Sequence, residues 1–217
     1  MNHTVEADAP VPFGYKCSWL AIRSPDPQQV IVALDLVDTR PSSWQAGVEA
    51  AYHGNVFVTP VVRGWVLVVS MNLPWPERDD HPDACTDFLL SLGRHFPDVQ
   101  FFATHRVVET HAWARVANGV IVRQYACSGE QGEVHWDYGV ETAEETRLRL
   151  QQEDYFKSFD AEEQAEWEAE ESAITTFMPS ESDVMHIASL WSIDPTALDT
   201  LDLEPSFGYV GVFRSGQ

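Results

Sequence analysis

Apolar residues in the first part of the chain recur at two spacings, that of strands and that of short helices. After Asp26, a candidate N-cap, Val30, Ile31 and Leu34 form a short apolar stripe at helical spacing. SSWQAGVEAAY (42–52) indicates a further helical turn. Strands are favoured at three runs of β-branched and aromatic residues, GYKCSWLAI (14–22), NVFVTPVV (55–62) and GWVLVVS (64–70).

A proline-rich acidic loop, residues 72–83, separates these elements from a second set. In DACTDFLLSLGRHF (83–96) the apolar residues recur at helical intervals. Strand-like alternation follows, and Asn118-Gly119 is a strong hairpin signal. The strands are expected within VQFFATHRVV (99–108), HAWARVANGVIVRQYAC (111–127) and GEVHWDY (132–138).

From Thr142 onward the pattern becomes helical and rich in Glu, Gln and Leu. A capped helix at PSESDVMHIASLW (179–191) and a strand at SFGYVGVF (206–213) complete the series. Because consecutive strands look hairpin-connected, we expect an α+β fold with a mainly antiparallel sheet, packed helices and an acidic helical segment (142–177) before the last strand. We expect one domain over residues 1–217, with residues 1–12 frayed.

The chain carries a net charge of −21, yet its hydrophobic fraction of 44% is that of a folded protein. Residues 141–204 hold 18 acidic side chains against three basic ones, so most of the charge lies there. Such acidity argues against nucleic acid or an anionic membrane as a direct partner. No window is apolar enough for a membrane span and no signal peptide is visible, which predicts a cytoplasmic protein.

The three cysteines, Cys17, Cys85 and Cys127, are far apart and form no CxxC or Cys/His cluster. We therefore expect reduced, buried thiols, with no disulfide, no bound metal and no cofactor. Cys127 could act as a nucleophile with His105 or His135 as its base, but nothing nearby in the sequence marks it as activated.

THRVVETH (104–111) holds the one cluster of catalytic residue types. In a single straight strand His105, Glu109 and His111 would share a face and could hold zinc or iron. Alternatively, these residues form cross-strand polar pairs or flank a turn between two strands. Motifs for nucleotide, hydrolase, metalloprotease or calcium chemistry are missing, and we expect no enzyme.

Residues 183–198, DVMHIASLWSIDPTAL, superficially resemble a helix-turn-helix motif. Such a motif must bring cations to phosphate, and here His186 is the only potential cation in a strongly anionic region. We expect a helical pair packed in the core.

DAEEQAEWEAEESAITTF (160–177) places seven carboxylates in twelve positions without a cation. A capping box and the helix dipole account for the first turn, whereas the later carboxylates repel one another at helical spacing. Solubility is one explanation. An electrostatic surface for a basic partner is the other, and the concentration of charge favours it. The residues expected to bind are Asp160, Glu162, Glu163, Glu166, Trp167, Glu170, Glu171, Asp79 and Asp80.

Trp167 has two possible placements. If the stripe of alanines from Ala161 to Ala173 packs on another element, Trp167 is displayed among carboxylates and can anchor a partner. If the helix continues from Tyr155, Phe156 and Ile174 share an apolar face with Trp167, and the tryptophan belongs to the core.

In size, acidity, cytosolic character and lack of catalytic motifs, the chain resembles bacterial immunity proteins that neutralise nuclease toxins, including toxins delivered by type VI secretion. The resemblance implies one-to-one binding of a basic toxin in the producing cell, with carboxylates covering the surface that binds phosphate. The alternative is an enzyme, or a protein that binds a metal or small molecule, using His105, Glu109 and His111.

Overall fold

An antiparallel sheet dominates the computed structural model, which describes residues 5–76, 83–129, 133–158 and 177–214. Within these residues the sheet has nine strands in the order β2-β9-β3-β4-β1-β5-β6-β7-β8, and every pairing is antiparallel. The strands are β1 (Cys17–Arg23), β2 (Leu36–Ser43), β3 (Val56–Val62), β4 (Trp65–Ser70), β5 (Asp98–His105), β6 (Thr110–Ala117), β7 (Val120–Ser128), β8 (Glu133–Gly139) and β9 (Phe207–Phe213).

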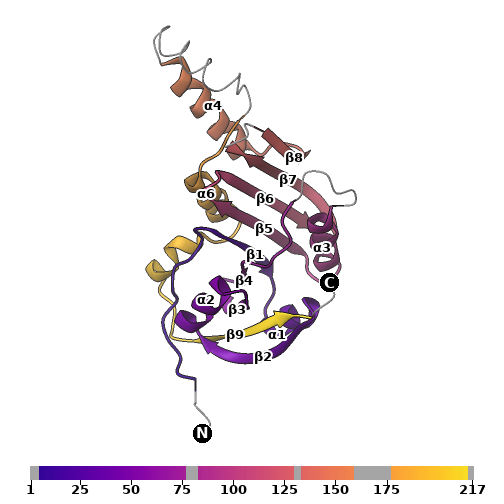
Figure 1. The fold of residues 1–217 in the computed structure, drawn as a ribbon, viewed down its shortest axis with the longest axis vertical. Helices are drawn as coiled ribbons and strands as arrows, with labels where there is room; N and C mark the ends of the chain where they lie inside the picture. The colour runs from indigo at the N-terminus through magenta and orange to yellow at the C-terminus, as the bar shows by residue number, and fades with distance from the viewer. Residues whose placement is uncertain (1–4, 77–82, 130–132, 159–176, 215–217) are drawn as a thin grey trace.

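Helices cover both faces of the sheet (Figure 1). One face packs on α1 (Pro27–Ala33) and α3 (Ala84–Gly93), and the other on α2 (Trp44–Tyr52), α6 (Glu181–Trp191) and the 3-10 helix η2 (Pro195–Thr200). Central strands such as β4 are therefore buried along their whole length, which explains their uninterrupted apolar sequence. The predicted α+β fold with a mainly antiparallel sheet is confirmed.

Side-chain caps define where the helices begin. The Asp26 carboxylate accepts a hydrogen bond from Gln28 N at 2.8 Å, and Asp83 caps α3 in the same way. Ser180 and Asp183 form a reciprocal capping box at the start of α6. Each cap satisfies amide groups that have no partner within their own helix.

The hairpin of β6 and β7 turns at the predicted position. Asn118 and Gly119 have φ values of 51° and 78°, which are the left-handed values that a two-residue hairpin turn requires.

Strand β2 was missing from the sequence prediction. It carries few apolar residues because it lies at the edge of the sheet, where β9 is its one partner among the described strands. Pro41, which cannot donate a backbone hydrogen bond, is tolerated at such an edge.

Residues 5–12, expected to be frayed, are instead tied to the body. Asp8 forms an isolated antiparallel bridge with Ser206. Its carboxylate also accepts hydrogen bonds from the backbone of Trp44 and Gln45, at 2.6 and 3.0 Å, at the start of α2. An acidic side chain at this position matches the positive end of the α2 dipole.

The helical pair expected at residues 183–198 is α6 with η2, and it packs in the core through Val184, Ile187 and Leu198. Cys17, Cys85 and Cys127 are free, buried thiols, as predicted. Among the described residues, no helix is long and apolar enough to cross a membrane.

Candidate functional site

The acidic residues predicted to bind a partner lie outside the described residues. This holds for Asp79 and Asp80, which precede α3 in the sequence, and for Asp160, Glu162, Glu163, Glu166, Trp167, Glu170 and Glu171. The structure does describe α4 (Ala143–Lys157), the helix that leads to residues 160–177. We call residues 160–177 the acidic stretch. In Figure 1, α4 extends away from the β7–β8 end of the sheet.

A buried ion pair fixes the first turn of α4 on the sheet. Glu145 is 1% exposed, and its Oε1 accepts hydrogen bonds from Trp113 Nε1 at 2.9 Å and from Arg123 Nε at 2.7 Å. Its other oxygen accepts the backbone N–H of Thr142 at 2.8 Å. Removing Arg123 would leave the Glu145 charge uncompensated in the interior, so the pair specifies where α4 begins.

Arg123 of β7 also has several hydrogen-bond partners, although it is only 4% exposed. Its Nη1 donates to Asp137 Oδ1 at 2.5 Å and to the backbone oxygens of Gln124 and Tyr138, both at 3.0 Å. The guanidinium therefore ties β7 to β8 as well as to α4. With its charge neutralised twice, it is no free cation for a ligand.

The remaining cations of α4 are also paired. Arg147 binds Glu144, which contacts His186 of α6 at 2.6 Å. Arg149 binds Glu141 at 3.0 Å and Glu153 at 2.7 Å. Lys157, at the end of the helix, pairs with Glu153 and Asp154 at 3.9 and 3.4 Å. Within the described residues, α4 thus presents no unpaired cation that could attract phosphate.

The segment 104–111 is a hairpin and not a straight strand. His105 pairs with Thr110 and Thr104 pairs with His111, so the two histidines lie on opposite faces of the sheet. The turn between them includes Glu109 at φ +46°. The shared face considered for His105, Glu109 and His111 is therefore wrong, and the alternative of residues flanking a turn is confirmed.

His111 lies in a buried row that crosses four strands. Its register neighbours are Thr104 on β5 and Cys127 on β7, and Cys17 on β1 follows Thr104. The His111 ring is 4% exposed, and its Nδ1 lies 3.0 Å from Thr104 Oγ1. Burial lowers the pKa of His111 to about 4, although the nearby Asp183 carboxylate acts in the opposite direction. The ring is therefore neutral at physiological pH.

Cys127 and His111 do not form an activated nucleophile and base. Burial raises the pKa of the Cys127 thiol to about 12, so the thiolate is scarce at neutral pH. The bases considered for it were His105 and His135, and neither is its register neighbour on β6 or β8: that position is held by His111 and by Val134. This environment is that of a buried structural cysteine.

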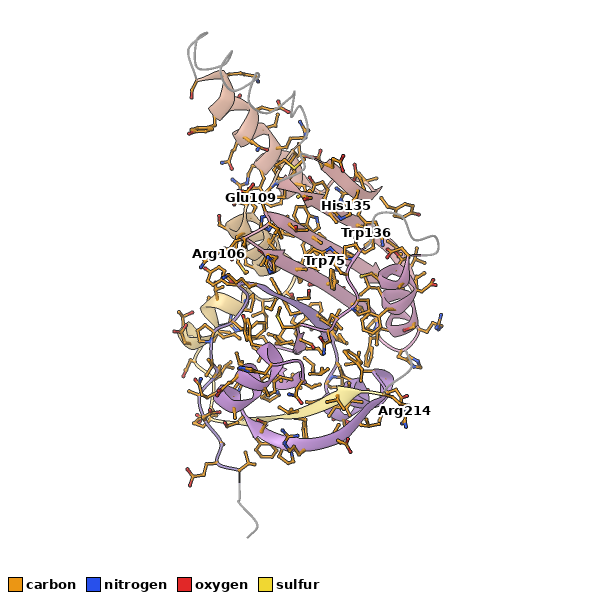
Figure 2. All side chains as sticks on the ribbon, viewed as in Figure 1. Trp75, Arg106, Glu109, His135, Trp136 and Arg214 are labelled. Atoms are coloured by element: carbon orange, nitrogen blue, oxygen red, sulfur yellow. The ribbon has the colours of Figure 1, made fainter. Side chains whose placement is uncertain are left out.

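A cleft of about 290 Å³ opens where the β5–β6 turn meets the chain entering α6. We call it the hairpin cleft. Its lining includes Arg106 and Glu109 from the turn, His111 from β6, and Met178, Pro179 and Glu181 from the α6 side. The cleft thus unites Glu109 and His111 of the predicted cluster and leaves His105 out. Arg106 and Glu109 are labelled at this end of the sheet in Figure 2.

Among the described residues, no group of three or more His, Cys, Asp or Glu side chains is arranged to hold a metal ion. In the described lining of the hairpin cleft, His111 is the one imidazole, and it lies with the Arg106 guanidinium beside carboxylates from the β5–β6 turn and from α6. The chemistry available there is hydrogen bonding and charge pairing.

Comparison of the chain with protein-family models, with curated proteins and with solved structures finds no match in any of the three.

Two features were missed from the sequence, the Arg123–Glu145 pair and the Thr104–His111 contact. Arg123 did leave a signal, because an arginine inside the apolar run VIVRQYAC must find a partner if the strand is buried. Nothing in the sequence pointed to Glu145 as that partner, since it is one of many acidic residues in its region.

Proposed function

We propose that this protein is an acidic binding protein of the cytoplasm that inhibits a basic, nuclease-type bacterial toxin by covering its phosphate-binding surface. The observation that carries the proposal is an imbalance of charge. Every cation of α4 is neutralised by a neighbouring carboxylate, whereas residues 160–171 bring seven further carboxylates without any cation.

The partner chemistry follows from electrostatics. A nuclease must hold phosphate, and it does so with clustered Lys and Arg side chains. A dense row of carboxylates offers the same charge as a phosphate backbone and competes for that surface. Complementary charge also speeds the encounter of the two proteins. Six described Lys and Arg side chains are already held in ion pairs, and the chain as a whole has 13 Lys and Arg against 34 Asp and Glu, a balance that disfavours nucleic acid as a direct partner.

The anchoring of α4 supports the same proposal. A recognition surface binds more tightly when its position is fixed before the partner arrives, because less conformational entropy is lost. The Arg123–Glu145 pair and the hydrogen bond from Trp113 fix the start of the helix that leads to the acidic stretch.

A second candidate function rests on one observation, the shared position of Glu109 and His111 in the hairpin cleft beside Arg106. A small polar molecule could bind there. The neutral His111 ring and the protonated Cys127 thiol favour a binding site over a catalytic one.

The direct test uses the product of the gene adjacent to the one that encodes this protein. That product is purified, its nuclease activity is measured, and an equimolar amount of this protein is added. We expect activity to fall to background and a one-to-one complex to appear in size-exclusion chromatography. A neighbouring product that is not basic, or a nuclease that stays fully active, would argue against an immunity function.

A further inference from the structure

The hairpin cleft has an excess of negative charge. Glu109 and Glu181 line it, and Asp183 is close enough to act on the charge of His111. Arg106 supplies one opposing charge from the exposed turn, and no ion pair joins it to these carboxylates in the described part of the chain. The net field therefore favours a cation.

Glu181 needs a hydrogen-bond donor. Its Oε1 is buried and has no hydrogen-bond partner among the described residues. A carboxylate oxygen removed from water without a donor is costly, and the most effective donors are charged N–H groups. Because Glu181 lies in the lining of the cleft, a ligand bound there can supply the donor.

His111 adds a polar atom without adding charge. His111 is 4% exposed, and its Nδ1 lies within hydrogen-bond distance of Thr104 Oγ1. Its Nε2 makes no hydrogen bond within the described residues, although the ring lines the cleft. A neutral ring does not repel a cation, and a protonated one would.

We propose that the hairpin cleft binds a guanidinium or primary ammonium group. Glu181 and Glu109 accept its N–H bonds, and the side chains of Met178 and Pro179 contact the methylene stem that carries it. We assign this group to an arginine or lysine side chain of the basic partner, an assignment that rests on the proposed function. The cleft then forms a second contact, separate from the acidic stretch.

The test uses ethylguanidinium and ethylammonium as probes of the intact protein, with tetramethylammonium as a cation that lacks N–H donors. Binding is followed through the ring signals of His111 in ¹H–¹⁵N spectra. We expect saturable shifts with ethylguanidinium, with a dissociation constant of about 1–10 mM for so small a ligand. Tetramethylammonium should produce no saturable shift. Equal responses to all three cations would reduce the effect to general screening and overturn the proposal.

Two variants address the site itself. Glu181→Gln and Glu109→Gln should each weaken ethylguanidinium binding by about ten-fold or more, since each removes a charged acceptor. Glu204→Gln is the matched control, because it removes one exposed carboxylate that does not line the cleft. Circular dichroism confirms that each variant is folded. Unchanged affinity in both cleft variants would refute the assignment, as would a saturable response to zinc without one to ethylguanidinium.

The source of the group is tested with two further probes, a capped Gly-Arg-Gly tripeptide and the diamine putrescine. Binding of the tripeptide at least as tight as that of ethylguanidinium supports a protein side chain. Much tighter binding of putrescine with rejection of the tripeptide would overturn that assignment in favour of a free polyamine. Neither result depends on the acidic stretch, so failure here is distinct from failure of the immunity function.

Discussion

The imidazole of His111 is a neutral group held inside the sheet, and this makes folding sensitive to acid. In the native state burial keeps its pKa at about 4, whereas an unfolded chain has the ordinary value of 6.5. Between pH 4 and pH 6.5 the imidazole of the unfolded chain is protonated, whereas that of the native state is not. Stability is therefore intact above about pH 6.5 and falls as the pH drops toward 4.

We predict that His111→Asn flattens part of this pH dependence. The asparagine side chain can still contact Thr104 but does not titrate. Wild type should lose about 2 kcal/mol more than the variant between pH 7 and pH 5. Urea unfolding followed by tryptophan fluorescence at the two pH values measures the difference.

The exposed His53 offers the matched control for this experiment, because His53→Asn removes an imidazole outside the buried row. If His111→Asn and wild type lose stability in parallel on acidification, the ring is not the buried neutral group described here.

At the scale of the element, α4 is held by the buried contacts of its first turn, by the buried Leu148 and by two hydrogen bonds between Gln152 and Met178. Its last two turns carry exposed ion pairs, which contribute little because water and salt screen them. By contrast, Glu145 in the first turn is buried and accepts hydrogen bonds from Trp113, Arg123 and Thr142. One carboxylate thus joins three elements.

We predict that Glu145→Gln lowers the free energy of unfolding by about 1–3 kcal/mol, because the buried hydrogen bonds to Glu145 lose their charge while Asp137 still pairs with Arg123. Glu153→Gln on the same helix is the control and should cost less than about 1 kcal/mol, since its ion pairs are exposed. Urea unfolding gives both values.

The double variant Arg123→Met/Glu145→Leu should be more stable than the sum of its single changes, since no buried charge is left without a partner and the exposed Asp137 stays hydrated. Additive costs would show that the two residues do not interact as described.

At the scale of the whole molecule, charge is distributed unevenly, with 18 acidic residues against three basic ones in residues 141–204. Steering of a basic partner by such a region acts over roughly 8–10 Å at ordinary ionic strength. It affects the rate of encounter more than the lifetime of the complex.

We predict that reversing two of Glu162, Glu163, Glu166 and Glu170 to lysine slows association with the basic partner and flattens its salt dependence, while the fold survives. Trp167→Ala should speed dissociation, at a cost of about 2 kcal/mol or more, if the tryptophan is an interface anchor. It should lower the melting temperature instead if the tryptophan is core. Stopped-flow association, dissociation kinetics and thermal unfolding separate these effects.

Folded variants that bind the partner as wild type does would place the binding surface elsewhere. Reversing Asp199 and Asp202, which precede β9, provides a control of equal charge change outside the acidic stretch.

The sequence was sufficient for most of the fold because buried strands and capped helices leave local signals. Asp26 and the Asn118-Gly119 turn each act within a few residues, so their roles follow from the sequence alone. Asp83 caps α3 in an equally local way. Strand β2 left no such signal, because an edge strand is held by one neighbour and not by apolar burial.

The site was harder to predict because its parts come from distant segments. The hairpin cleft joins the β5–β6 turn to residues that precede α6, and no local spacing relates Glu109 to Glu181. His111 was recognised as a candidate, but its separation from His105 depended on a turn at residues 106–109 that the apolar Val107 and Val108 concealed. The partner-binding role of the acidic stretch remains a prediction.

The position of β9 has a consequence for how the protein is made. β9 fills the space between β2 and β3, yet β4, β5 to β8 and the helices after them precede it in sequence. At roughly 5–20 residues per second, a ribosome completes that long intervening stretch well after β2 and β3 have emerged. Until β9 arrives, β2 lacks a pairing strand among those described and one edge of β3 stays unpaired, open to the strands of other nascent chains. Such distant pairing slows folding. Newly synthesised molecules are therefore most prone to aggregate before β9 has been inserted.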